Sequence, residues 1–263
     1  MAAAHGAAAA PREGAPAAPS RVKLKSTGPP VLPPAGKENI SLDTSAPVRI
    51  LTVCTGNICR SPVAERLLQA GLDQVVPGGF EVSSAGTRAL VGQPMQPISA
   101  DIVRTFGGNP EGFAARQLTP KILRGVDLVL TMTSGHRGEV LQLDASLLKR
   151  TFTIREFARM LNVLDQRAAE ADTQPAGPPQ EAAPDDESRL AANAAFWRGL
   201  PARAAGVRHL SLPADPAEND IVDPYRRSPE VYREMEDQLA PAIVSILRHA
   251  RLNAPVSPDA AQL

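Results

Sequence analysis

The chain contains little cysteine and no excess of either charge, and each shortage excludes a class of protein. Two cysteines in 263 residues are too few for a disulfide-stapled secreted scaffold, and they fit a reducing interior. Basic and acidic residues number 28 each, so the charge gives no sign of nucleic-acid binding. The sequence has no 18-residue apolar run for a membrane span and no apolar signal segment for secretion. It therefore predicts a cytoplasmic protein.

Large apolar side chains are nearly missing from residues 1–46, which consist mainly of alanine, proline and glycine. Such a segment cannot bury enough surface to offset the entropy of ordering its backbone, so the sequence predicts a disordered tail. A few basic residues and a shortage of acids leave a transit peptide as the alternative for this tail. Residues 253–263 are predicted as a flexible C-terminus.

The chain between these ends, residues 47–252, is predicted as one catalytic domain that an insertion at about 165–218 interrupts. Proline, alanine, glutamine and acids dominate 168–187, which is the composition of a flexible linker. Residues 188–205 carry apolar side chains at helical spacing around Trp197, and they predict a helix that docks on the core. The insertion is interpreted either as a neutral addition or as a partner-binding or regulatory element.

Apolar runs and helical patterns alternate along the domain, and this order predicts a fold. The strand-like runs cover 48–53, 79–84, 126–131 and 151–154, and the helical patterns cover about 61–73, 97–107, 134–143, 154–164 and 228–251. Strands that alternate with helices form parallel sheets, so we expect a three-layer α/β sandwich with a four-stranded parallel sheet. Ligands bind beyond the carboxyl ends of such strands, and Cys54 directly follows the first strand.

Residues 54–62, CTGNICRSP, have the composition of a phosphate-binding loop. Five residues separate Cys54 from Arg60, and Gly56 and Asn57 let the backbone curl so that its N–H groups point inward at an anion. The helix that follows presents its N-terminus to the same anion. The helix dipole and the arginine charge favour the cysteine thiolate, which is the form that attacks phosphorus.

The loop resembles the signature loop of the low-molecular-weight protein tyrosine phosphatase family, in which a cysteine, five residues, an arginine and a serine form the catalytic cradle. Later segments resemble the later blocks of that family in the same order: VSSAGT at 82–87, GQP at 92–94, DLVLTM at 127–132 with His136, and DPY at 223–225. The matched segments span about residues 48–160 and 219–250.

The resemblance implies a role for each residue of the loop and of the DPY segment. Cys54 is the expected nucleophile, Arg60 the expected clamp of the transition state, and Asp223 the expected proton donor and later base. The other residues expected to bind phosphate or substrate are Thr55, Gly56, Asn57, Ile58, Cys59, Ser61 and Tyr225. Ser61 would support the thiolate, and Tyr225 would form an aromatic wall of the pocket. Arginine and amides supply the electrostatics, so no metal and no cofactor are expected.

The implied reaction is hydrolysis of a phosphotyrosine-containing protein or a small phosphomonoester through a cysteinyl-phosphate intermediate. One alternative is an arsenate reductase of the same fold, which would need an external thiol relay because no cysteine lies outside the loop. Another alternative is a non-catalytic phosphate-binding scaffold. The presence of Cys54, Arg60 and Asp223 together argues against this scaffold.

The second cysteine of the loop carries two interpretations. The family pairs the two loop cysteines, so oxidation could join Cys59 to Cys54 in a disulfide that spares the nucleophile from irreversible oxidation. Alternatively, Cys59 is a passive packing thiol. With no other cysteine in the chain, Cys59 is the only internal partner that Cys54 can have.

Other polar and aromatic residues near the motifs have roles that the sequence leaves less defined. Ser84 and Thr87 hydrogen-bond under the loop, as the family pattern suggests, or they serve only a strand-to-turn connection. His136 is interpreted as a helix-surface or packing residue rather than a catalyst. Tyr232 and Met235 share a helical face with apolar neighbours, so both are predicted to pack in the core.

Overall fold

The computed structural model describes residues 45–171 and 185–255. The predicted tail over 1–46 therefore lies almost wholly outside the described residues, as do most of the predicted linker over 168–187 and of the C-terminus over 253–263. Within the described part of the chain, no helix has both the length and the apolar character needed to cross a membrane.

The core of the described part of the chain is a parallel sheet of four strands, as predicted, and the strands follow the order β2-β1-β3-β4. The strands are β1 (Val48–Cys54), β2 (Phe80–Gly86), β3 (Leu128–Thr131) and β4 (Thr151–Thr153). The central strand β1 is apolar along most of its length because neighbouring strands and helices cover it on both sides. All four strands point the same way, so their carboxyl ends meet at one edge of the sheet.

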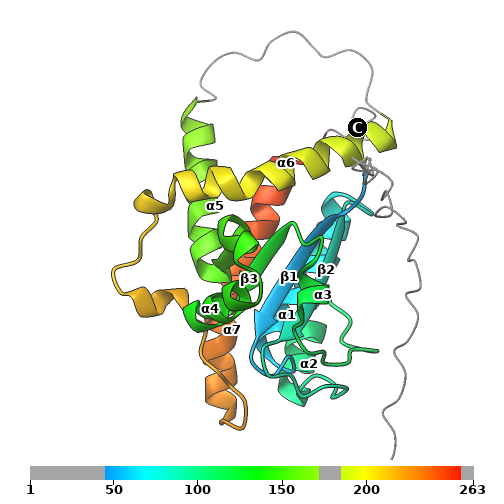
Figure 1. Cartoon of the computed structure of the whole chain (residues 1–263), viewed down its shortest axis with the longest axis vertical. Coiled ribbons are helices and arrows are strands. Elements are labelled where there is room, and N and C mark those ends of the chain that lie inside the picture. The colour runs from blue at the N-terminus through cyan, green and yellow to red at the C-terminus, as the bar shows by residue number, and fades with distance from the viewer. Residues whose placement is uncertain (1–44, 172–184, 256–263) are drawn as a thin grey trace, which may run out of the picture. The chain divides into compact units, whose positions relative to one another are not determined.

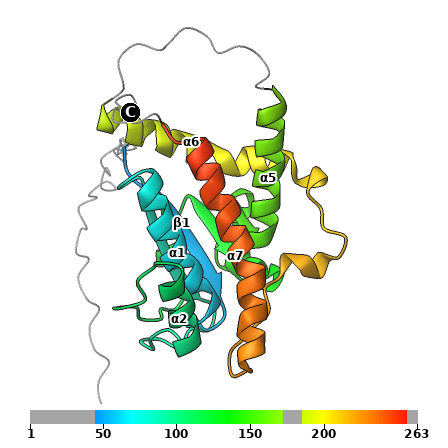
Figure 2. The same ribbon diagram turned by 180° about the vertical axis from the view of Figure 1, so that it is seen from behind.

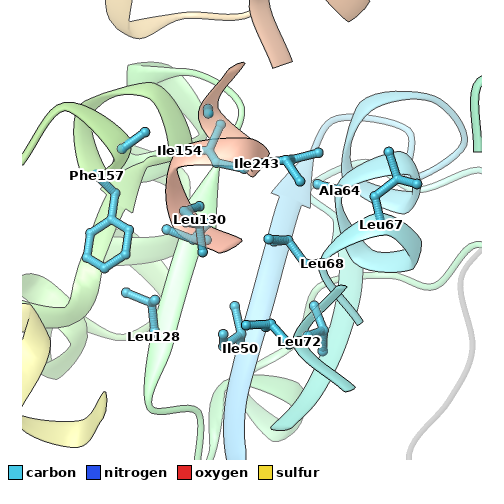
Figure 3. Packing of buried hydrophobic residues seen from close by; sticks show 14 of the residues in the cluster. Ile50, Ala64, Leu67, Leu68, Leu72, Leu128, Leu130, Ile154, Phe157 and Ile243 are labelled. Atoms are coloured by element: carbon cyan, nitrogen blue, oxygen red, sulfur yellow. The ribbon is translucent and has the colours of Figure 1, made fainter. Parts of the chain in front are cut away.

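One face of the sheet is covered by α1 (Arg60–Val75), α5 (Ile154–Ala171) and α7 (Pro229–Leu252), as Figure 2 shows. Apolar side chains of these helices join Ile50 and Leu130 of the sheet in a continuous buried cluster (Figure 3). Each helix has one apolar stripe and one polar stripe, so burying the apolar stripe fixes its orientation on the sheet.

The opposite face is covered by α3 (Pro120–Leu123), α4 (Ser134–Leu143) and the 3₁₀ helix η1 (Ala145–Arg150). Their apolar residues form a second buried cluster with Leu51 and Val53 of β1. The predicted three-layer α/β sandwich is thereby confirmed. The remaining described helices are α2 (Pro97–Thr105), α6 (Asp186–Gly206) and the 3₁₀ helices η2 (Arg208–Leu210) and η3 (Pro216–Asn219).

Helix α5 is longer than predicted, because it continues to Ala171 instead of ending near residue 164. Its buried side chains end at Leu161, and the rest of the helix is progressively exposed. The prediction followed the apolar pattern, whereas the alanine-rich last turns are helical through intrinsic propensity. The first residues of the predicted insertion at about 165–218 therefore belong to a helix of the core.

The helix predicted over 188–205 is present as α6, and it crosses the amino-terminal end of the sheet (Figure 1). Trp197 is 2 % exposed, and its ring packs edge-on against Phe80 with centroids 5.0 Å apart. The Asn193 side chain donates to the carbonyl of Gly79, and Arg198 pairs with Asp127 at 3.3 Å. The partners of α6 lie at or just before the first residues of β2 and β3, so the inserted helix closes the end of the sheet remote from Cys54.

Replacing Trp197 tests whether α6 belongs to the core. Trp197→Ala leaves a large cavity against Phe80, so we expect the free energy of unfolding to fall by about 3 to 5 kcal/mol. Urea unfolding followed by circular dichroism measures this loss. Leu212→Ala is the control, because that side chain is 68 % exposed and its loss should cost less than about 0.5 kcal/mol. Similar small costs for both variants would contradict an integral α6.

Candidate active site

The phosphate loop connects β1 to α1, and Asn57 determines its curvature. The backbone of Asn57 has a φ of 55°, in the left-handed region that non-glycine residues rarely adopt. Its side-chain amide donates to Ser61 Oγ at 3.0 Å and to Ser84 Oγ at 2.7 Å. Its side-chain oxygen accepts the backbone N–H of Arg116 at 2.8 Å. These three bonds hold Asn57 in a conformation that its backbone alone would not favour.

Cys54 is the last residue of β1, and its thiol is almost completely buried at the base of the loop. Its Sγ lies 3.0 Å from Ser61 Oγ and accepts the backbone N–H of Asn57 at 3.3 Å. Hydrogen-bond donors around a sulfur stabilise its thiolate form, and the N-terminus of α1 adds a partial positive charge nearby. The sulfur is therefore in surroundings that suit a nucleophile.

Arg60 closes the loop with a guanidinium group in which one of the three nitrogens, Nε, has no hydrogen-bond partner among the described residues. One terminal nitrogen, Nη1, donates to the carbonyl of Ile221 at 3.0 Å, and Nη2 lies 2.9 Å from Oδ2 of Asp223. The third nitrogen, Nε, is buried and has no hydrogen-bond partner among the described residues. A buried unpaired donor is costly, and an anion in the loop would satisfy it.

Asp223 reaches the loop from the segment that precedes α7. Its side chain is half-exposed, and Oδ1 accepts the backbone N–H of Tyr225 at 3.2 Å. The segment is anchored upstream, because Ser134 donates to Asp220 Oδ1 and the backbone N–H of Ile221 donates to the carbonyl of Met132 at 2.8 Å. The fold thereby brings Asp223 against Arg60 across the whole insertion.

A cavity of about 110 Å³ opens above the sulfur. It is lined by Cys54, Thr55, Gly56, Ile58, Cys59, Arg60, Arg88, Leu90, Asp223 and Tyr225. Its floor is the curled backbone of the loop, and its walls combine apolar side chains with two arginines and one carboxylate. The described residues hold no group of three or more histidine, cysteine or acidic side chains that could bind a metal ion.

Comparison with known proteins places this site in a family. The family described as "Low molecular weight phosphotyrosine protein phosphatase" matches residues 49–170. The low molecular weight protein-tyrosine-phosphatase Etp of Escherichia coli K12 is 38% identical over 116 residues, which cover 44% of this chain and 75% of Etp. The chain belongs to the low molecular weight protein-tyrosine phosphatase family. Its resemblance to that family, inferred from the loop and the later blocks, is confirmed.

Two further known proteins are also similar to this chain. Wzb of E. coli K12 is 44% identical over 87 residues, which cover 33% of this chain and 56% of Wzb. The solved structure of the YwlE arginine phosphatase from Geobacillus stearothermophilus aligns with a TM-score of 0.50 at 25% identity, over 78% of this chain and 94% of that one. The family match ends at residue 170, so α6 and Asp223 lie beyond it.

The expected site residues of this family member fall into two groups in the structure. All the predicted ones line the cavity except Asn57 and Ser61, which are fully buried behind the loop. Two further cavity residues, Arg88 and Leu90, are not among the predicted site residues. They follow the carboxyl end of β2, which neighbours β1, so the parallel-sheet rule for ligand sites could have identified them.

The structure also shows the surroundings of the residues whose roles the sequence left less defined. Ser84 lies under the loop, bonded to Asn57 and to Glu65, whereas Thr87 Oγ1 is buried without a hydrogen-bond partner among the described residues. Burial raises the pKa of Glu65. Tyr232 and Met235 are buried as predicted, at 4 % and 0 % exposure.

The thiol of Cys59 lies beside Tyr232, with Sγ and the phenol oxygen 3.8 Å apart. Burial raises the pKa of the Cys59 thiol to about 11, with a further contribution from the nearby charge of Cys54. The two loop cysteines therefore differ in their surroundings. Hydrogen-bond donors surround the sulfur of Cys54, whereas Cys59 is held as a neutral thiol.

His136 is buried as a packing residue would be, but its contacts are polar. Its Nε2 lies 2.8 Å from Thr55 Oγ1 in the phosphate loop, and its Nδ1 lies 2.9 Å from Thr133 Oγ1. Burial lowers the pKa of His136 to about 4, and the positive charge of Arg60 lowers it further. The imidazole is therefore neutral at physiological pH. The sequence identified this residue but not its contact with the loop.

The lowered pKa of His136 predicts loss of stability in acid. Its folded-state pKa of about 4 lies below the 6.5 of an unperturbed histidine, so protonation favours the unfolded chain. The stability that depends on a neutral His136 is fully present above pH 6.5 and is lost as the pH falls toward 4. Lowering the pH from 7.5 to 5 should therefore reduce the free energy of unfolding by about 2 kcal/mol.

Urea unfolding at these two pH values measures the cost. His136→Gln should reduce the difference between the two pH values by about 2 kcal/mol, because glutamine does not titrate. His209→Gln is the matched control, because His209 is exposed on the surface. An unchanged pH difference in His136→Gln would show that His136 is not the group responsible. His249, whose pKa burial also lowers, should account for part of the remaining dependence.

Proposed function

We propose that this protein hydrolyses phosphotyrosine in proteins through a cysteinyl-phosphate intermediate. The observation that carries the proposal is the buried, unpaired Nε of Arg60 in the loop that holds the Cys54 sulfur, with Asp223 2.9 Å from the same guanidinium. These groups supply an anion clamp, a nucleophile and a proton donor around one cavity. Membership of a family whose relatives Etp and Wzb are named protein-tyrosine phosphatases supports the same reaction.

In the first step, the Cys54 thiolate attacks phosphorus while the bond to the tyrosine oxygen breaks. Backbone N–H groups of residues 55–60 and the Arg60 guanidinium bind the three equatorial oxygens, whose charge spreads in the transition state. Asp223 in its protonated form donates its proton to the departing phenolate. The phosphate takes the place of the Asp223 carboxylate on Arg60, which leaves the carboxyl group beside the leaving oxygen.

In the second step, water hydrolyses the cysteinyl-phosphate. Asp223, now a carboxylate, accepts a proton from the water as its oxygen attacks phosphorus, and the sulfur–phosphorus bond breaks. The Ser61 hydroxyl, 3.0 Å from Sγ, donates a hydrogen bond to the sulfur and stabilises it as the leaving thiolate. Inorganic phosphate then leaves, and the nucleophile is ready for another substrate.

The walls of the cavity support phosphotyrosine as the substrate class. Ile58, Leu90 and Tyr225 line it, and apolar and aromatic side chains suit the phenyl ring of a tyrosine. A phosphoarginine, the class of substrate named for YwlE, would bring a third guanidinium next to those of Arg60 and Arg88. The cavity holds a single carboxylate, Asp223, which would then face three guanidinium groups and compensate only part of their charge.

The alternatives have less support. An arsenate reductase would have to relay oxidation through another thiol, and Cys59, the only other cysteine, is buried with a pKa of about 11. A non-catalytic scaffold would not need the complete set of Cys54, Arg60 and Asp223 around one cavity. We also propose a cytoplasmic location, because a thiolate nucleophile persists in a reducing compartment.

Substitution of the nucleophile and of the acid tests the mechanism. With p-nitrophenyl phosphate, Cys54→Ser should lower kcat at least about a thousandfold, because a serine hydroxyl stays protonated at this site. Asp223→Asn should lower kcat about a hundredfold or more. Phosphatase activity retained in Cys54→Ser would contradict the mechanism.

Two substrate assays with the wild type test the alternatives. Reduction of arsenate without phosphatase activity would favour the reductase. Faster turnover of phosphoarginine peptides than of phosphotyrosine peptides would show that phosphoarginine, and not phosphotyrosine, is the substrate class.

Oxidation tests the proposed pairing of the two loop cysteines. Mild peroxide should inactivate the enzyme, and a thiol reductant should restore it, because a Cys54–Cys59 disulfide is reducible and a sulfinic acid is not. In Cys59→Ala the same treatment should cause permanent loss of activity. Activity before and after reduction, with mass spectrometry of the loop peptide, measures both outcomes. Irreversible loss to the same extent in both proteins would exclude the protective disulfide.

A further inference from the structure

The first turn of α4 contacts both loops of the proposed active site. His136 bonds to Thr55, the residue that follows the nucleophile, with Nε2 and Oγ1 2.8 Å apart. Two residues earlier, Ser134 donates from its backbone N–H and from its hydroxyl to Asp220 Oδ1, at 2.7 and 2.9 Å. Asp220 lies three residues before Asp223. One helical turn therefore connects the segment of the nucleophile to the segment of the acid.

The hydrogen bonds around His136 define how it acts on Thr55. Thr133 Oγ1 accepts the backbone N–H of His136 at 3.1 Å as the cap of α4, which directs its own proton toward Nδ1. A neutral imidazole then carries its proton on Nε2 and donates it to Thr55 Oγ1. A pKa of about 4 is consistent with a neutral ring. Thr55 is also held through its carbonyl, which accepts the N–H of Arg88 at 3.0 Å.

We propose that His136 is a positioning residue that fixes the Cys54–Thr55 end of the phosphate loop, while Ser134 in the same turn fixes the loop of Asp223. The inference rests on the proposed phosphatase function. Because both contacts originate in one rigid turn, the turn sets the separation of sulfur and carboxyl group. A histidine that served only to fill space would need neither the hydroxyl of Thr55 nor that of Thr133.

The two contacts should affect different parts of the reaction, so leaving-group dependence separates them. His136→Leu, which keeps the bulk but not the hydrogen bonds, should lower kcat/KM about tenfold or more for both p-nitrophenyl and phenyl phosphate. It should also weaken binding of inorganic phosphate about tenfold, since the loop amides are misplaced. Ser134→Ala should slow the hydrolysis of phenyl phosphate more than that of p-nitrophenyl phosphate. Phenolate is the poorer leaving group, so its departure depends more strongly on proton donation by Asp223.

Matched variants separate positioning from stability. His136→Gln retains a side-chain N–H that can reach Thr55, so it should recover part of the activity lost in His136→Leu. The double variant Thr55→Val/His136→Leu should be no slower than the slower single variant, because the two residues share one interaction. His209→Leu, at an exposed position, should keep the activity of the wild type. Thermal unfolding of every variant shows whether the chain is folded during the assay.

Several outcomes would overturn the inference. Rates and phosphate affinity within twofold of the wild type in a folded His136→Leu would exclude a positioning role. If the loss of kcat/KM in the double variant equals the product of the losses in the two single variants, Thr55 and His136 act separately. A wild type that hydrolyses neither substrate would instead overturn the proposed function. The affinity for inorganic phosphate, measured by calorimetry, would still test the His136 contact in that case.

Discussion

The left-handed backbone of Asn57 is the constraint on which the rest of the site depends. Without it the chain would leave β1 in an extended path, and the N–H groups of the loop would not converge above Cys54. The three hydrogen bonds of the Asn57 side chain offset the cost of this conformation. They come from α1, from β2 and from the segment before α3, so the loop is shaped by three separate parts of the fold.

The candidate site and the inserted helix α6 lie at opposite ends of the sheet. The carboxyl ends of β1, β2 and β3 carry the phosphate loop, Arg88 and the first turn of α4, whereas α6 closes the amino-terminal end. The helix inserted between the two parts of the active site therefore contributes no residue to the cavity. The inserted helix also contributes Trp197 to the main apolar cluster, so it has become part of the core.

Much of the fold and of the loop could be predicted from the sequence because both depend on local patterns. Alternating apolar runs specify the strands, and the spacing of Cys54 and Arg60 specifies a phosphate-sized loop. The end of α5 could not be read in this way, because its last turns bury little apolar surface. The contact of His136 with Thr55 depends on the parallel pairing of β1 with β3, and no pattern in either segment records it.

The sequence predicted which residues of α6 face the core, but it did not predict which end of the sheet the helix covers. Apolar residues at helical spacing showed that 188–205 would dock somewhere. The choice of the amino-terminal end follows from Asn193 and Arg198, which meet Gly79 and Asp127 there. Such polar contacts join residues more than 70 positions apart, and only the assembled sheet brings them together.

The Asp223 carboxylate pairs with Arg60 and therefore competes with any anion that binds in the cavity. A monoanion such as chloride gains little by displacing a carboxylate that is already 2.9 Å from the guanidinium, whereas a phosphate dianion brings more charge and more acceptors. In the proposed reaction the same carboxylate returns to Arg60 when inorganic phosphate departs, which offsets the cost of losing the phosphate from the guanidinium. The ion pair thus discourages small ions from occupying the cavity and helps the product to leave it.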